Sequence, residues 1–153
     1  MAAHPDFHEC LSCSCFAARR AARTITQHYE RHLKPSGLRV GQFTVLALLA
    51  AMGAQPLTRL AEQLAMERTT LTRNLGALLE RGLVTESPTA DGRVRLLAIT
   101  RRGTAAARAA LPRWREAQKS IARQLGDGAI RALTAASTAT TMLGSRSQLH
   151  TRS

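Results

Sequence analysis

Apolar side chains recur at helical spacing in two neighbouring segments near the middle of the chain. Residues 68–81 carry a leucine at every third or fourth position in most of their length, which is the pattern of a helix with one buried face. These leucines are Leu71, Leu75, Leu78 and Leu79. Residues 58–64 show a shorter version of the same pattern and end just before the second segment begins. Two short helices joined by a tight turn predict a helix-turn-helix.

Longer helical stretches flank this pair. Residues 10–34 and 101–145 are rich in alanine, leucine and arginine, which favour helices, and residues 41–52 form a further apolar helix. Within the last stretch, Pro112 predicts a kink or a division of the helix. The Gly-Asp-Gly sequence at 126–128 predicts a break.

The period of the pattern changes after the helix-turn-helix. Residues 83–86 and 93–99 predict two strands, and Asp91-Gly92 between them is a strong hairpin signal. A hairpin directly after a helix-turn-helix forms a wing. The sequence therefore predicts a mainly α fold, with a winged helix-turn-helix lobe at 38–100 that carries a two-stranded β-wing.

The 153 residues fit a single domain, 1–153, better than two. The helices at 10–34 and 101–145 are too long to serve only as packing for so small a lobe. We therefore expect them to be N- and C-terminal dimerisation helices. Residues 1–9 and 146–153 are expected to be flexible ends.

The net charge of +12 favours polyanionic partners, nucleic acid first. Only 3% of the residues are aromatic, and single-strand binding by base stacking needs aromatic platforms. Double-stranded DNA is therefore the expected partner.

The hydrophobic pattern gives no reason to expect a membrane partner. The chain contains no apolar run of roughly 18 residues, the length expected of a membrane span. Its first residues also lack a basic segment followed by an apolar one, so we expect no secretory signal. The odd number of cysteines, three, argues against a disulfide scaffold and favours a reducing compartment. The expected location is the cytoplasm.

From roughly Cys15 to Leu143 the sequence resembles the MarR family of transcriptional regulators, and the most specific part of the resemblance lies between residues 57 and 103. The residues that carry the resemblance are Leu57-Thr58-Arg59-Leu60-Ala61-Glu62-Gln63-Leu64, Thr69-Thr70-Leu71-Thr72-Arg73-Asn74-Leu75, Leu78-Leu79-Glu80-Arg81-Gly82-Leu83-Val84, Asp91-Gly92-Arg93 and Leu97-Ala98-Ile99-Thr100-Arg101-Arg102-Gly103. The resemblance implies a homodimer that binds a pseudo-palindromic operator. It also implies that the second helix of the helix-turn-helix enters the major groove and that the wing reaches the adjacent minor groove.

The N-terminal half of that second helix holds the candidate DNA contacts, because such helices contact bases and nearby phosphates with their first residues. The candidates are Arg68, Thr69, Thr70, Thr72 and Arg73. The threonine hydroxyls are short donors suited to phosphate. The guanidinium of Arg73 has the geometry to bind guanine with two hydrogen bonds.

The wing supplies three further candidates. Arg93 is the candidate for insertion into a narrow minor groove, where negative potential is concentrated. Arg95 lies on the same side of the strand and is expected to contact phosphate. By resemblance, Asp91 orients the wing arginine through an ion pair; as an ordinary turn residue it would instead hydrogen-bond its own backbone.

Three cysteines, Cys10, Cys13 and Cys15, crowd the start of the first long helix, and three interpretations of them stay open. As small hydrophobes they would pack at a dimer interface. As accessible thiols they would sense oxidants. With His4 and His8 they would offer ligands to a soft metal, but their spacing matches no closed zinc motif. We therefore assign no metal ligand.

Cys15-Phe16-Ala17 resembles the stretch that carries the peroxide-reactive cysteine in the organic hydroperoxide resistance regulators, a branch of the MarR family. Tyr29 falls where that branch has a tyrosine paired to the thiolate. The resemblance makes Cys15 the candidate sensor, with Cys10 or Cys13 as a resolving thiol. Many other members of the family release DNA when a small aromatic acid binds between the dimer helices and the DNA-binding lobe, so the inducer is left open.

The sequence thus predicts a transcriptional regulator that is not an enzyme and needs no cofactor: a repressor that a small molecule or an oxidant releases from DNA. Three alternatives remain: a thiol peroxidase-like enzyme that uses Cys15, a metal-sensing protein and a non-specific DNA-binding protein. Against the enzyme, no acid–base group accompanies the cysteine in the sequence pattern. The ratio of operator affinity to random-DNA affinity separates the regulator from the non-specific binder.

Overall fold

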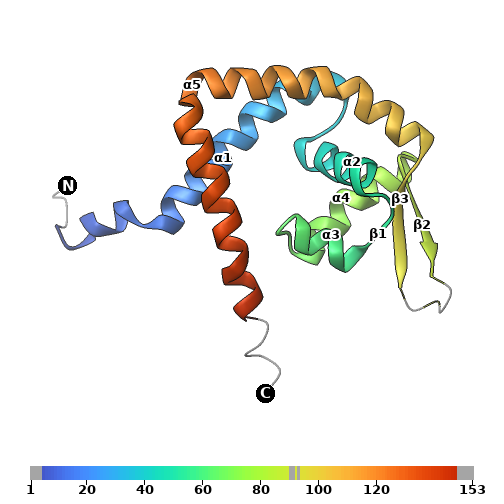
Figure 1. Cartoon of the computed structure of the whole chain (residues 1–153), viewed down its shortest axis with the longest axis horizontal. Helices are drawn as coiled ribbons and strands as arrows, with labels where there is room; N and C mark the ends of the chain where they lie inside the picture. The colour runs from blue at the N-terminus through green and yellow to red at the C-terminus, as the bar shows by residue number, and fades with distance from the viewer. Residues whose placement is uncertain (1–4, 90–91, 93, 148–153) are drawn as a thin grey trace.

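The computed structural model describes residues 5–89, 92 and 94–147, and its elements follow the predicted order (Figure 1). The elements are the 3-10 helix η1 (Pro5–Ser12), α1 (Ser14–Leu33), the 3-10 turn η2 (Lys34–Ser36), α2 (Val40–Met52), β1 (Gln55–Pro56), α3 (Leu57–Gln63), α4 (Arg68–Glu80), β2 (Val84–Pro88), β3 (Arg95–Ile99) and α5 (Arg101–Ser147).

The lobe is built around the predicted leucine stripe. Leu71, Leu75 and Leu78 on α4 are buried, as the spacing predicted, whereas Leu79 lies at the edge of the core and is 36% exposed. The stripe shares one core with buried residues of α2, α3, β3 and the α4–β2 connection, which include Leu46, Leu49, Leu60, Leu97 and Leu83. In Figure 1, α5 lies above α2, and α3 and α4 lie beneath it.

The two wing strands are confirmed, and the sheet has a third strand that the sequence did not predict. The strand order is β1-β3-β2, antiparallel throughout, with Val84 opposite Ile99 and Pro88 opposite Arg95. The extra strand, β1, has only two residues, too few for a visible alternation of apolar and polar positions. Pro56 is tolerated there because β1 is at the edge of the sheet.

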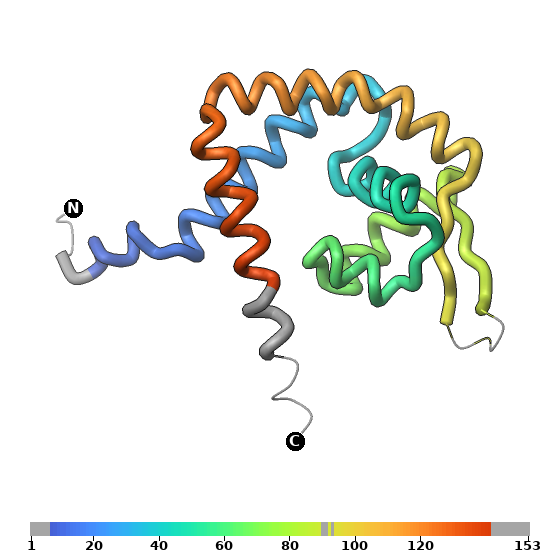
Figure 2. The backbone as a smooth tube through the Cα atoms, viewed as in Figure 1, coloured from blue at the N-terminus to red at the C-terminus, as the bar shows by residue number. Residues whose placement is uncertain are grey.

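Helix α5 breaks at Gly126, the only residue of Arg101–Ser147 with non-helical backbone angles (φ +76°, ψ 158°). Figure 2 shows the sharp change of direction, where the tube passes from orange to red. The break predicted at residues 126–128 is therefore confirmed. The division predicted at Pro112 is wrong, because α5 continues through this residue with helical backbone angles. The carbonyl group left without its helical N–H partner is that of Arg108, and both Arg108 and Pro112 are exposed, so this side of the helix faces water rather than the core.

Helix α1 packs against the first half of α5. His28 is buried, and its Nε2 donates a hydrogen bond to the carbonyl oxygen of Ala117 (3.2 Å), while the Tyr29 hydroxyl donates to Gln118 Oε1. The start of α1 and the second half of α5 extend beyond the lobe as two crossing arms (Figure 2).

Among the described residues, no single helix combines the length and apolar character needed to cross a membrane. One bent pair, Ser14–Ser36 with Val40–Met52 at 77°, passes by length and composition only.

Candidate nucleic-acid interface

Helix α4 presents its predicted contact residues on the side opposite its buried leucines. Arg68, Thr69, Thr70, Thr72 and Arg73 are all exposed. Leu71 is fully buried and Leu75 is 4% exposed, so the lobe holds this face outward through its own core. The five predicted residues therefore form one continuous polar surface over the first two turns of α4.

The start of α4 favours an anion. Its first amides have no partner inside the helix, and the helix dipole adds partial positive charge there. The N-cap residue is Glu67, whose side chain makes no capping hydrogen bond. The amides are therefore not satisfied by that side chain and can meet a phosphate.

The hydroxyl groups of this surface are not equivalent. Thr72 Oγ1 donates to the carbonyl oxygen of Arg68 (2.7 Å), so its single proton is used within the helix. Within the described part of the chain, Thr69 and Thr70 have no such side-chain hydrogen bond. Thr69 and Thr70 are therefore better phosphate donors than Thr72.

A contact that the sequence analysis missed fixes how α4 sits on the lobe. Asn74 is half-buried and faces α2, where a Cβ added at Gly41 would lie 3.1 Å from Asn74 Nδ2. The absence of a side chain at Gly41 lets α2 and α4 approach closely. Neither residue stands out in the apolar pattern, because the pattern marks only the leucine face.

The wing holds one predicted contact residue in an ion pair. Arg95 Nη1 lies 3.1 Å from Glu86 Oε2, and the two side chains are 65% and 31% exposed. An exposed pair of this kind stabilises the fold by about 1 kcal/mol at most. A phosphate that contacts Arg95 would therefore compete with Glu86. This competition makes Arg95 a weaker candidate for a phosphate contact.

The other two wing residues, Asp91 and Arg93, lie outside the described residues. Their neighbours show a tight turn, because the Thr89 amide donates to the Val94 carbonyl and the Gly92 amide donates to the Thr89 carbonyl, both at 2.8 Å. Gly92 has φ +70°, a conformation that favours glycine. The roles of Asp91 and Arg93 stay predictions.

The three cysteines are all exposed, and Cys13 occupies a special position. It is the N-cap of α1, and its amide donates to the carbonyl oxygen of Cys10 (3.2 Å). The backbone amides of Phe16 and then Cys15, at the start of α1, lower the pKa of the Cys13 thiol below its ordinary value. The structure therefore favours Cys13 as the reactive thiol, whereas the resemblance favoured Cys15.

Neither Tyr29 nor His8 has a hydrogen bond to a cysteine in the described part of the chain. The hydroxyl of Tyr29 is engaged with Gln118, and burial raises the pKa of this phenol. His4 lies outside the described residues and His8 is exposed. The residues that the structure describes contain no group of three or more His, Cys, Asp or Glu side chains that could hold a metal ion.

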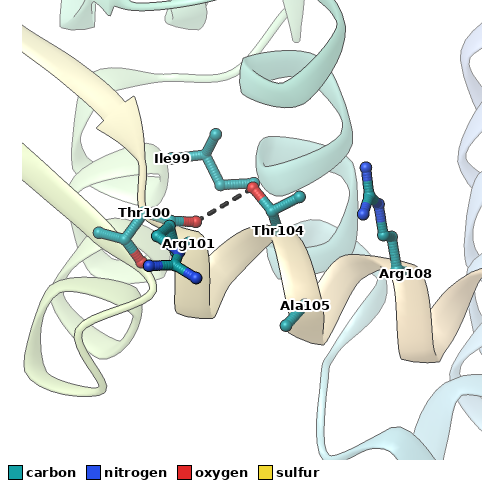
Figure 3. Close-up of a pocket in the computed structure, with 6 residues that line it drawn as sticks. All are labelled: Ile99, Thr100, Arg101, Thr104, Ala105 and Arg108. Atoms are coloured by element: carbon teal, nitrogen blue, oxygen red, sulfur yellow. Dashed lines mark hydrogen bonds between the residues drawn. The ribbon is translucent and has the colours of Figure 1, made fainter.

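Two neighbouring hollows lie where α5 meets the lobe. One, of about 280 Å³, lies between α2, β3 and α5; its lining is mostly apolar and includes Phe43, Ala47, Ile99, Leu111 and Arg108. The other, of about 420 Å³, is more open and lies on the outer side of α5 between Arg101 and Arg108, with Thr104 between them (Figure 3). Arg108 borders both hollows.

Comparison with solved structures identifies this arrangement. The crystal structure of the transcriptional regulator MosR from M. tuberculosis in complex with DNA is 37% identical and superposes with a TM-score of 0.75. The match covers 86% of this chain and 98% of MosR. Residues 38–94, which include α2, α3, α4 and the first wing strand β2, match the model of the MarR family. The chain belongs to the MarR family.

Members of the MarR family are DNA-binding transcriptional regulators rather than enzymes, which confirms the predicted class of protein. The HTH-type transcriptional regulator MhqR from Bacillus subtilis (strain 168) is 34% identical over 86 residues. That match spans 55% of this chain and 59% of MhqR, so the chain covers less than two thirds of this relative. The structure of a MarR mutant from E. coli with operator DNA shows the same fold, with a TM-score of 0.75. It is 18% identical, and the match covers 88% of this chain and 96% of that one.

Proposed function

We propose that this MarR-family chain is a cytoplasmic homodimer that binds a pseudo-palindromic operator and represses transcription until a signal releases it. The observation that carries the proposal is the exposed polar surface at the start of α4, with Arg68 and Arg73 held outward by buried leucines. MosR, which shares this fold at 37% identity, was solved in complex with DNA. In a winged helix, this surface is the part that enters the major groove.

The homodimer is supported by the apolar side chains on the two arms. Phe7, Leu11 and Phe16 near the start, and Leu125 and Leu133 on α5, are each 42–67% exposed in the isolated chain. Large apolar side chains that are left exposed on several helices are available to an interface. A second copy would cover it, and two α4 helices would then bind half-sites about 34 Å apart, one turn of the duplex.

The hollow between α2, β3 and α5 supports a small aromatic acid as the inducer. Its apolar lining suits an aromatic ring, and Arg108 at its edge could bind a carboxylate with two hydrogen bonds. A ligand there would touch both the lobe and α5. In a dimer, the ligand would release DNA if it bound more tightly to a conformation in which the distance between the two lobes does not fit the operator.

The exposed thiols support an oxidant as a second candidate for the inducer. Cys13 is accessible, and its lowered pKa raises the fraction of thiolate, the form that attacks peroxides. The attack would transfer one peroxide oxygen to the Cys13 sulfur and release an alcohol. Cys10 or Cys15 would then form a disulfide with the sulfenic acid and release water.

A titration of the chain onto two duplexes tests the proposal. One duplex carries the DNA upstream of the chain's own gene and the other a scrambled sequence, both at one physiological salt concentration. We expect the upstream duplex to bind at least about 10³-fold more tightly, the lower end for specific recognition. Equal affinity for the two duplexes at every salt concentration would contradict recognition of this DNA and favour the non-specific alternative.

The same titration separates the two inducers. A panel of benzoates is added to one sample and a stoichiometric organic peroxide to another. If a benzoate releases the DNA from the wild type but not from Arg108→Gln, the inducer is an aromatic acid. If peroxide releases the DNA from the wild type but not from Cys13→Ser, the inducer is an oxidant. Release that survives both substitutions would contradict both sites.

The thiol chemistry gives a prediction of its own. Because the pKa of Cys13 is lowered, its alkylation by iodoacetamide is expected to rise with pH and reach its plateau at a lower pH than that of free glutathione. Peptide mass spectrometry after timed alkylation measures the rate at Cys13. A plateau at or above the pH found for glutathione would show that the Phe16 and Cys15 amides do not stabilise the thiolate.

A further inference from the structure

The positive charge of this chain is not concentrated on its DNA-binding lobe. Residues 14–36 and 101–141 hold thirteen of the 22 basic residues and three of the ten acidic ones, a net charge of +10. Residues 37–100 hold seven basic and five acidic residues, a net charge of only +2. Recognition of an operator by α4 therefore leaves most of the charge of the chain unexplained.

Much of the remaining charge lies in one row on α5. The row consists of Arg101, Arg108, Arg115, Lys119 and Arg123, which we call the outer basic face. Their spacings of seven and four residues place them on one side of the helix. All five are exposed, whereas Gly103, Ala110 and Ala117 on the opposite side are buried.

This face points away from the recognition surface. Helix α2 lies between α5 and α4, as Figure 1 shows, and contacts both of them. The outer basic face of α5 and the exposed face of α4 therefore lie on opposite sides of the lobe. A duplex bound by α4 would leave the outer basic face open.

Among the described residues, no acidic side chain forms an ion pair with a cation of the outer basic face. The two ion pairs found in that part of the chain are Arg95–Glu86 and Arg113–Glu116. Arg115, Lys119 and Arg123 also follow each other at intervals of four residues, where like charges repel and destabilise a helix. An arrangement that costs helix stability is not explained by the fold alone.

The outer basic face is long enough to reach phosphates across about one turn of a duplex. Arg101 and Arg123 are 22 residues apart, which corresponds to about 33 Å along a helix, or about one turn of duplex DNA. At one end, the hollow between Arg101 and Arg108 is bordered by two guanidinium groups within about 420 Å³ (Figure 3). The Thr104 hydroxyl between them donates to the Thr100 carbonyl oxygen (3.1 Å), so the two arginines supply the donors. Guanidinium groups bind phosphate oxygens in pairs of parallel hydrogen bonds.

We propose that the outer basic face of α5 is a second nucleic-acid-binding surface, which holds the phosphate backbone of a duplex other than the operator without reading its sequence. The proposal goes beyond operator recognition, because it uses no residue of α4 or the wing. One molecule could then hold two duplexes together. The chemistry recognised is a regular row of phosphates, so binding by this face falls steeply as salt rises.

The test measures whether bead-bound upstream duplex, saturated with the protein, retains a fluorescent scrambled duplex. The variant Arg115→Gln/Lys119→Gln/Arg123→Gln removes three charges from the outer basic face. The control Arg31→Gln/Lys34→Gln/Arg39→Gln removes three from exposed positions at the end of α1 and in the connection to α2. We expect the wild type and the control to retain the scrambled duplex, and the α5 variant to retain roughly tenfold less. Affinity for the upstream duplex should stay within about twofold in all three.

A second variant separates binding from folding. Lys119→Glu should improve the helix, since a carboxylate there is four residues from both Arg115 and Arg123. We therefore expect its melting temperature to match or exceed that of the wild type, while its retention of the scrambled duplex falls.

Three results would overturn the proposal. One is a wild type that retains no scrambled duplex, and another is an α5 variant that retains as much as the control. The third is retention of poly-L-glutamate in place of the duplex, which would assign the face to an acidic protein. The affinity of each variant for the scrambled duplex is also measured without upstream DNA. The α5 variant and the control can then be compared even if the chain does not recognise the upstream DNA.

Discussion

Arg73→Ala is expected to weaken binding to the operator by about 10- to 100-fold, which corresponds to roughly 1–3 kcal/mol. Arg73 is exposed on the second turn of α4, and the buried Leu71 and Leu75 fix the direction of that face. A guanidinium that binds a guanine edge contributes to one sequence more than to others. Affinity for scrambled DNA should therefore fall much less than affinity for the operator.

Fluorescence anisotropy with operator and scrambled duplexes at one salt concentration measures both losses. Arg31→Ala is the matched control, because it removes the same charge from an exposed position of α1. A loss of similar size on both duplexes would make Arg73 a phosphate contact. Unchanged affinity for both would remove it from the interface.

Gly103→Ala is expected to lower the free energy of unfolding by roughly 3 kcal/mol, at the upper end of the range for overpacking. A Cβ at this position would overlap the carbonyl oxygen of Leu83 and crowd Ile99. The obstacle is backbone, which cannot rotate away as a side chain can. The first turn of α5 would have to move off the end of the α4–β2 connection.

This close approach also supports the start of α5. Thr100 Oγ1 accepts a hydrogen bond from the Gly103 amide (3.0 Å) and donates one to the Gly82 carbonyl (2.7 Å). A displaced helix would lose this N-cap as well, at a further cost of about 1 kcal/mol. Gly103 therefore lies where the first turn of α5 packs against the α4–β2 connection and the end of β3.

Thermal and urea unfolding measure the effect of Gly103→Ala. The control is Gly76→Ala within α4, where an added Cβ meets nothing within 4 Å. Because alanine favours a helix over glycine, this control should stabilise the protein by about 0.5–1 kcal/mol. Equal melting temperatures for Gly103→Ala and the wild type would show that α5 does not need this close contact.

Much of the lobe was predictable because its signals are local. The leucine spacing on α4 identified the buried face before any tertiary contact was known, and the same spacing placed Arg73 on the outside. Asp91-Gly92 predicted the hairpin, since few sequences accommodate so tight a turn. The Gly-Asp-Gly break in α5 likewise follows from the backbone freedom of glycine, here used at Gly126 with φ +76°.

The sequence by itself determined the winged helix, the exposed row on α4 and the net charge, because periodicity, turn residues and composition act over a few neighbouring residues. Only the tertiary structure decided features that depend on distant partners. These are the pairing of Gln55–Pro56 with β3, the capture of Arg95 by Glu86 across the hairpin and the contact of Gly103 with Leu83. It also decided which of the many exposed cations lie together, since that depends on which side of α5 the core covers.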